Sequence, residues 1–98
     1  MTRSKTWTFL TNHAIVLLQV STNSHLTVRE IADRIGITER AVQRILADLE
    51  ETGYLVRRRV GRRTQYSVSP DRPFRHPTMS HLDIEGLLKL FEPARRRW

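Results

Sequence analysis

Residues 26–58, "LTVREIADRIGITERAVQRILADLEETGYLVRR", contain two helical patterns separated by a single glycine. The letters "TVRE" form a capping box, in which Thr27 accepts a hydrogen bond from the backbone of Glu30 and Glu30 accepts one from the backbone of Thr27. Apolar residues then recur with helical spacing up to Gly36, which can adopt the left-handed conformation at a helix end. Thr38 is placed to cap the next helix. The stretch therefore predicts a helix-turn-helix.

Downstream of Gly53, which ends the second of these helices, the pattern changes from helical to extended. "YLVRRRV" and "TQYSV" are rich in β-branched and aromatic residues and are joined through "GRR". Gly61 can supply the positive φ that a hairpin turn needs. We expect a β-hairpin, or wing, over 57–66, with Arg58 on its inner side and the stem of that side chain covering apolar surface.

A further helix is expected on each side of this region. Thr11 or Asn12 can cap a helix that runs to about Val20, and this helix is apolar on more than one face. It is therefore either central to the domain or shared with a second subunit. Ser80, followed by Asp83, opens a last short helix that Pro93 closes.

The fold class predicted from these patterns is mainly α with a small β-hairpin (α+β). It comprises a three-helix core, a wing and an extra C-terminal helix. The expected segments are an N-terminal arm (1–11), the winged helix-turn-helix domain (12–69), a proline-rich connector (70–79), the C-terminal helix (80–92) and a basic tail (93–98).

The amino-acid composition limits the classes of function that the chain can have. Seventeen Lys and Arg residues against ten Asp and Glu residues give a net charge of +7, which favours a polyanionic partner. The absence of cysteine excludes disulfides and thiolate metal sites. The apolar runs are too short to span a bilayer and the N-terminus lacks a signal-peptide core, so we expect a cytoplasmic protein without membrane contact.

The segments "LTVREIADRIGITERAVQRILADLEETGYLVRR" and "VGRRTQYSV" resemble the winged helix-turn-helix transcriptional regulators of bacteria, of the MarR and ArsR type. The resemblance covers roughly residues 12–68. It implies a sequence-specific regulator that binds double-stranded DNA as a homodimer. It also implies that the helix over about 38–52 enters the major groove, while the wing lies on the backbone or in the minor groove.

Side chains opposite the apolar stripe of that helix suit base edges. Arginine can donate two hydrogen bonds to guanine, glutamine can pair with adenine, and glutamate can accept from cytosine. The alternative is a solvated helix face in which Arg44 pairs with Asp48 four residues later. The expected base-contacting residues are Thr38, Glu39, Arg40, Gln43 and Arg44.

The wing supplies a second basic surface, because arginine is attracted to phosphates and to the negative potential of the minor groove. The alternative is an edge hairpin whose charges prevent aggregation. Which of Arg57–Arg59 contact DNA stays open at this point. The expected backbone and wing contacts are Thr27, Arg57, Arg59, Arg62 and Arg63.

The C-terminal helix is expected either to pack on its own domain or to form part of a dimer contact. Apolar residues outside the motif are candidates for that contact. They are Trp7, Phe9, Leu17, Ile84, Leu87, Leu88 and Phe91. No two histidines have the helical spacing of metal ligands, so His13, His25, His76 and His81, together with Asp83, are expected to be ordinary surface residues, and no metal or cofactor is expected.

No catalytic motif appears, so the chain is not expected to be an enzyme. Any small-molecule effector is expected at the dimer interface, and the alternative is regulation through the abundance of the protein. Two other functions stay open: a winged-helix module that binds protein or RNA, and a DNA-binding protein of weak sequence preference.

Overall fold

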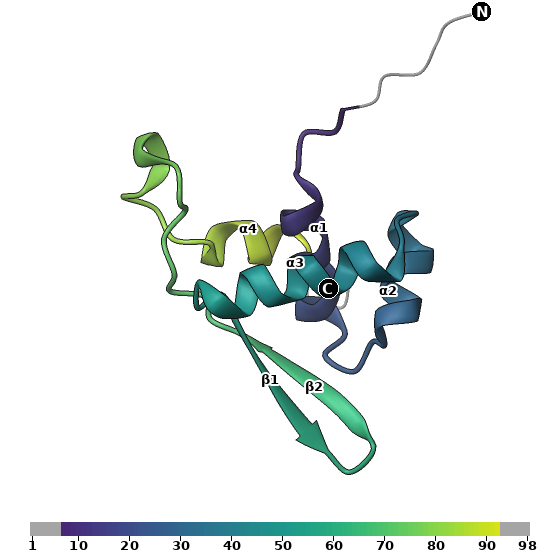
Figure 1. Ribbon diagram of the computed structural model, residues 1–98. Helices are drawn as coiled ribbons and strands as arrows, with labels where there is room; N and C mark the ends of the chain where they lie inside the picture. Colours follow the sequence, from purple (N-terminus) through teal and green to yellow (C-terminus); the bar gives the residue numbers. More distant parts are fainter. Residues whose placement is uncertain (1–6, 93–98) are drawn as a thin grey trace, which may run out of the picture.

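The computed structural model describes residues 7–92, so most of the predicted arm and all of the basic tail lie outside the described residues. Three helices come first, α1 (Asn12–Thr22), α2 (Val28–Ile35) and α3 (Glu39–Glu51). The hairpin strands β1 (Leu55–Val60) and β2 (Arg63–Val68) follow, then a 3-10 turn (Pro77–Met79) and α4 (Glu85–Leu90) (Figure 1). The predicted α+β winged helix is confirmed.

Local capping explains where the first three helices begin. The Thr11 hydroxyl accepts from the Ala14 N–H at 3.2 Å, and the Thr38 hydroxyl accepts from the Ala41 N–H at 3.0 Å. At α2 the capping box is complete. Gly36 ends α2 with a φ of 76°, so the turn between α2 and α3 uses the one residue type that adopts this conformation without strain.

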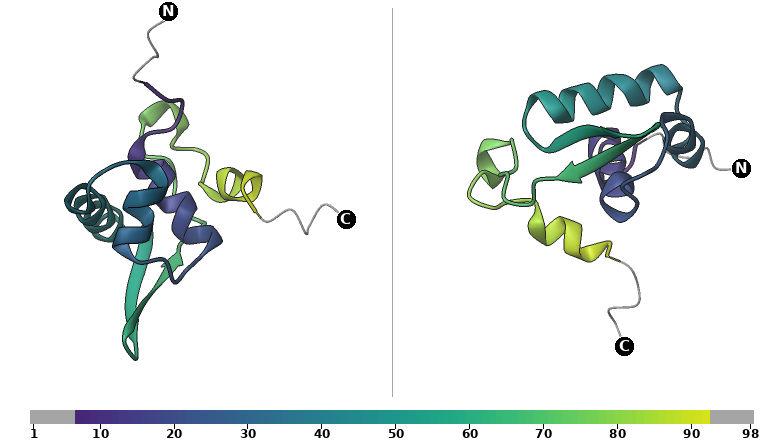
Figure 2. Two further views of the ribbon diagram at one scale, coloured as in Figure 1. Left: turned by 90° about the vertical axis from the view of Figure 1, so that its right-hand side faces the viewer. Right: turned by 90° about the horizontal axis from the view of Figure 1, so that it is seen from below.

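The core lies where the three helices meet the hairpin. Fully buried side chains come from the three helices and the first strand, including Val16 of α1, Ile31 of α2, Leu46 of α3 and Leu55 of β1. α1 contacts α2, α3 and β2, and in Figure 2 it lies between α3 and α4. Its apolar faces are therefore buried within this chain, which makes α1 the central helix of the domain.

The strands pair antiparallel through a turn of two residues, Gly61 and Arg62, with Gly61 at a φ of 64°. Arg57 lies opposite Tyr66 on the face that also carries Leu55, because side chains two residues apart share a face. The expectation that Arg58 occupies the inner side was wrong. A three-residue turn "GRR" would have placed Arg58 opposite Tyr66, but the observed turn is one residue shorter, which reverses the faces of β1.

The C-terminal segment also differs from its prediction. Ser80 ends the 3-10 turn, and α4 begins only at Glu85, whose N–H donates to the Asp83 carboxylate at 3.1 Å. Residues 82–84 run beside 72–74, with the Phe74 N–H donating to Leu82 and the Ile84 N–H donating to Arg72, both at 3.0 Å. Because residues 82–84 are bonded to that neighbouring segment, a helix cannot start at Ser80.

Candidate nucleic-acid interface

One side of α3 is free for a ligand. Its apolar stripe (Val42, Ile45, Leu46 and Leu49) is buried in the core. On the opposite side Glu39, Arg40, Gln43 and Arg44 are exposed. Within residues 7–92 these four side chains make no hydrogen bond or ion pair, so their donors and acceptors remain available.

The alternative prediction for this face, an intrahelical pair of Arg44 with Asp48, is not formed. The Asp48 carboxylate instead lies 2.8 Å from Nε2 of His13, at the start of α1. His13 was considered from the sequence only as a possible metal ligand. Its partner lies 35 residues away, so no local pattern could have identified the contact.

The position of Thr38 suits a dual role. Its hydroxyl oxygen caps α3 by accepting from the Ala41 N–H, and the side chain is exposed at the helix N-terminus. The hydroxyl proton is not used by the cap, so it can still be donated to an acceptor on a ligand. Thr38 therefore lies beside Glu39 and Arg40 at the end of α3 where the exposed polar face begins.

The other end of α3 is attached to the rest of the domain. Glu50 pairs with Arg57 of β1, with both Nε and Nη2 of the guanidinium within 2.9 Å of one carboxylate oxygen. Arg72 donates from Nη2 to the Thr52 carbonyl at 2.9 Å, where the last carbonyls of the helix lack intrahelical partners. Together with the Asp48–His13 pair, these contacts connect α3 to α1, to the wing and to the connector.

Arg72 was not predicted as a structural residue. Its guanidinium packs against Gly53, where an added Cβ would meet Arg72 Cζ at 3.1 Å. Gly53 has a φ of 86°, so glycine is required there by the backbone conformation and is also suited to the close approach of Arg72. The only sequence signal for this arrangement was the glycine itself.

The wing arginines fall into two groups. Arg57 is held by Glu50 and lies across the strand pair from Tyr66, whose pKa is raised by burial and partly lowered again by the Arg57 charge. The other side chains of the group are exposed, and in the described part of the chain none of them makes a hydrogen bond or ion pair: Arg58, Arg59, Arg62 and Arg63.

Thr27, the remaining predicted backbone contact, is exposed at the N-terminus of α2 and is engaged in the capping box. The Glu30 carboxylate accepts from the Thr27 N–H at 2.9 Å, and chiefly this hydrogen bond holds the pKa of Glu30 below its usual range. The charges of Arg34 and Arg63 act in the same direction. The cap therefore keeps an anionic carboxylate at the start of α2.

The residues predicted to form a dimer contact differ in how deeply they are buried. Leu17 and Ile84 are buried in the chain's own core, and Leu88 packs against it. Leu87 is half-buried beside a pocket, whereas Trp7, Phe9 and Phe91 are exposed. Leu17 and Ile84 are therefore packed mainly against their own chain, although both also line the pocket.

The described part of the chain has no other candidate site of the predicted kinds. No three His, Cys, Asp or Glu side chains between residues 7 and 92 come together as a metal site would require. Over the same residues, no helix has the length and apolar character needed to span a membrane.

Comparison with known proteins agrees with this architecture. HTH-type transcriptional regulators of Bacillus cereus and Bacillus anthracis are 42% identical to the chain over 43 residues, which is 44% of this chain and 29% of each relative. A riboflavin kinase of Thermococcus kodakarensis is 40% identical over 45 residues, 46% of this chain and 21% of that kinase. The chain thus spans less than a third of the length of these relatives. The model of the MarR family matches residues 8–63, more than half of the chain, and this chain therefore belongs to the MarR family of winged helix transcription regulators.

Proposed function

We propose that this chain is a transcription regulator that binds a specific sequence of double-stranded DNA. The observation that supports this best is the exposed, unpartnered polar side of α3, which begins at the helix N-terminus. In helix-turn-helix proteins the second helix enters the major groove with its N-terminal residues against the bases. The distribution of side chains on α3 suits that docking.

Each residue of this side has a matching base. The guanidinium groups of Arg40 and Arg44 suit guanine O6 and N7, and the Gln43 amide suits adenine N6 and N7. Glu39 suits the cytosine amine, and Thr38 can donate to a base or a nearby phosphate. The identity of these side chains favours recognition of sequence over binding to the backbone alone, because each base pair has a distinct pattern in the major groove.

The wing adds contacts that do not depend on sequence. Arg62 lies in the hairpin turn and Arg63 begins β2, and both are exposed. With Arg59 they suit phosphates or the minor groove, where arginine is favoured by the negative potential. The capping box uses the backbone N–H groups of Thr27 and Glu30, so the N–H groups of the two residues between them are those that suit a further phosphate. We assign Arg57 to positioning the wing, since Glu50 already binds its guanidinium.

We also propose that the regulator acts as a homodimer. Two half-sites about 34–36 Å apart, one helical turn of DNA, would each receive one α3. The exposed aromatic side chains Trp7, Phe9 and Phe91 support this proposal, because exposed apolar surface is available to a second copy.

The test is selection of preferred duplexes from a random pool, followed by fluorescence anisotropy across a salt series. We expect an enriched two-part site, and Arg44→Ala should cost about 1–3 kcal/mol on that site and relax its base preference at one position. Lys89→Ala on α4 removes the same charge away from α3 and should preserve the preference. An absence of any enriched site, with binding lost at physiological salt, would refute sequence-specific binding and redirect the search to protein or RNA partners.

A further inference from the structure

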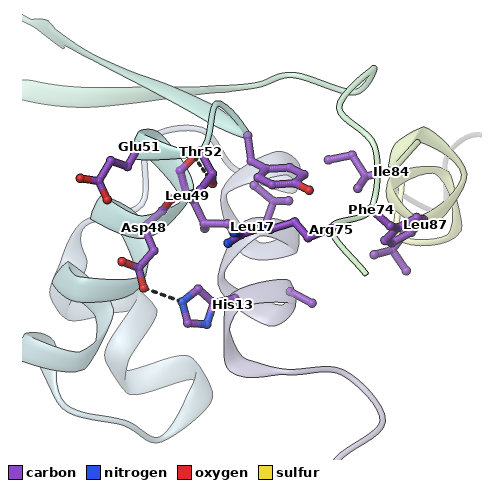
Figure 3. A pocket seen from close by; sticks show the side chains of 12 residues that line it. His13, Leu17, Asp48, Leu49, Glu51, Thr52, Phe74, Arg75, Ile84 and Leu87 are labelled. Carbon is purple, nitrogen blue, oxygen red and sulfur yellow. Dashed lines mark hydrogen bonds and ion pairs between the residues drawn. The ribbon is translucent and has the colours of Figure 1, made fainter. Parts of the chain in front are cut away.

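A pocket of about 600 Å³ opens beside the first turns of α1, away from the exposed polar side of α3 (Figure 3). Its apolar lining includes Leu17, Leu49, Ile84 and Leu87, which come from α1, α3, the residue before α4, and α4 itself. Polar residues border it, namely the His13–Asp48 pair, Glu51 and Arg75. The volume is in the range of sites that enclose a ligand of two or three rings.

Two aromatic side chains precede the same end of α1 and are not covered. Trp7 is 63% exposed and Phe9 is 94% exposed, and their rings meet edge to face with centroids 5.5 Å apart. Aromatic side chains bury about 150–250 Å² each when they are covered, so leaving both in water forgoes a large apolar contact. We call Trp7–Phe9 the aromatic arm.

The aromatic arm does not cover the pocket of its own chain. Thr11, which caps α1, is extended with a ψ of 163°, and the chain before it runs away from the helices (Figure 1). Thr8 donates to the Leu10 carbonyl, which fixes a local bend between the aromatic arm and the cap. Few residues separate Phe9 from His13 on the pocket rim, so a return into the same pocket would require a sharp reversal over Leu10 and Thr11.

We propose that this pocket receives the aromatic arm of a second copy of the chain, in reciprocal fashion. The proposal rests on the proposed function only in identifying where its dimer forms. Because the aromatic arm and the pocket lie at the same end of α1, a two-fold axis beside that end places each arm at the other copy's pocket. Such an exchange closes after two copies, as an isologous interface does.

The charges of the N-terminal segment and of the pocket border also favour the aromatic arm of a second copy as the occupant of the pocket. Residues 1–12 contain Arg3 and Lys5 and no acidic residue. The pocket border carries two carboxylates, Asp48, which is paired with His13, and Glu51, against the single guanidinium of Arg75. A basic segment that brings two aromatic rings therefore complements both the lining and the border of the pocket.

Crosslinking can test the exchange directly, because the chain contains no cysteine. Phe9→Cys and Leu87→Cys are prepared as separate single variants, one of them with a mass tag, and are mixed and oxidised. We expect a disulfide-linked heterodimer on a non-reducing gel. Phe9→Cys mixed with Leu90→Cys is the matched control, because Leu90 is also on α4 and is exposed but does not line the pocket. The control pair should crosslink about tenfold more slowly or less.

The double variant Phe9→Cys/Leu87→Cys separates exchange from folding back. Exchange gives a covalent dimer, whereas return of the aromatic arm to its own pocket gives a crosslinked monomer and overturns the proposal. Sedimentation velocity provides the second measurement: Phe9→Ala should raise the dimer dissociation constant roughly 10- to 30-fold, as for a buried aromatic anchor, and Leu90→Ala should leave it unchanged.

The remaining outcomes separate this proposal from the proposed function. A dimer that forms without the Phe9–Leu87 crosslink, or a chain that stays monomeric, overturns the aromatic-arm exchange even if DNA binding is retained. A crosslinked dimer that selects no DNA sequence supports the exchange and refutes the proposed function.

Discussion

Replacing Arg57 by alanine tests whether the wing arginines divide into one that holds the hairpin and others that contact DNA. Arg57 donates to Glu50, so its charge is already compensated within the domain. We expect Arg57→Ala to leave the salt dependence of DNA binding unchanged. Arg62→Ala removes an exposed charge in the turn and should weaken binding to all sequences alike.

The magnitude follows from counterion release. Each phosphate contact contributes a slope of roughly −0.9 to the logarithm of the binding constant against the logarithm of salt concentration. Between about 50 and 200 mM salt, one contact therefore accounts for about a 3.5-fold change in affinity. Anisotropy titrations resolve a change of that size, so Arg62→Ala should lower the slope by about one while Arg57→Ala retains the original slope.

Stability provides an independent measurement of the same pair. The Arg57 and Glu50 side chains are 37% and 40% exposed, so solvent screens them and the pair is worth no more than about 1 kcal/mol. A double-mutant cycle with Arg57→Ala and Glu50→Gln, measured by urea denaturation, should give a coupling of about 0.5–1 kcal/mol. Glu51→Gln is the matched control, since it removes the same charge from the neighbouring position.

Two results would refute the division of the wing arginines. One is a slope reduced by about one unit in Arg57→Ala, which would mean that Arg57 leaves Glu50 and contacts a phosphate. The other is a coupling energy near zero in the cycle, equal to that obtained with Glu51→Gln, which would mean that the pair does not hold the hairpin.

Other substitutions test the fold and its caps. Leu46→Ala empties a fully buried position and should lower the free energy of unfolding by about 2–5 kcal/mol in urea denaturation. Gly36→Ala should lower the free energy of unfolding by about 1 kcal/mol, because the φ of 76° strains any residue with a Cβ even though nothing lies within 4 Å of that position. Gly86→Ala, within α4, should leave the free energy of unfolding unchanged or raise it. Equal effects of the two substitutions would contradict this explanation. The lowered pKa of Glu30 means that its carboxylate stabilises the fold above the ordinary glutamate pKa and that this contribution is lost as the pH falls through the lower folded value. Glu30→Gln should therefore reduce the loss of unfolding free energy that is measured as the pH is lowered. An unchanged loss would show that the cap does not depend on the charge of Glu30.

The parts of the fold that the sequence predicted are those determined by near neighbours. Thr27 and Glu30 bond to each other, and Gly36 acts through its own backbone, so the ends of α2 are visible in a few consecutive letters. The apolar residues of α3 likewise recur with helical spacing, and their positions in the sequence determine which side of the helix is exposed. This is why Arg40, Gln43 and Arg44 were assigned to the exposed face from the sequence alone.

The errors lie where the length of one turn or the pairing of two separate segments decides the outcome. The length of the turn at Gly61 sets the register of the hairpin, and a change of one residue exchanges Arg57 for Arg58 on the inner face. The start of α4 depends on residues 82–84 pairing with 72–74, which no periodicity reveals. Ile84 was predicted as a dimer contact, with packing of its helix on the same domain as the alternative, and the structure places it in the core.

Under the proposed function the two halves of α3 have different tasks, one in binding DNA and the other in holding the helix in the domain. Hydrogen bonds to bases are directional, so the base contacts proposed for Arg40, Gln43 and Arg44 require a fixed angle of the helix. The C-terminal half carries carboxylates that would repel phosphates, but Asp48 and Glu50 are turned to His13 and Arg57 instead. Each of these exposed pairs stabilises the fold only weakly, so their main contribution is to fix the orientation of α3. Together with the buried stripe and the Arg72 contact to Thr52, they hold α3 from three elements and leave its N-terminal half exposed, as the proposed docking in a groove requires.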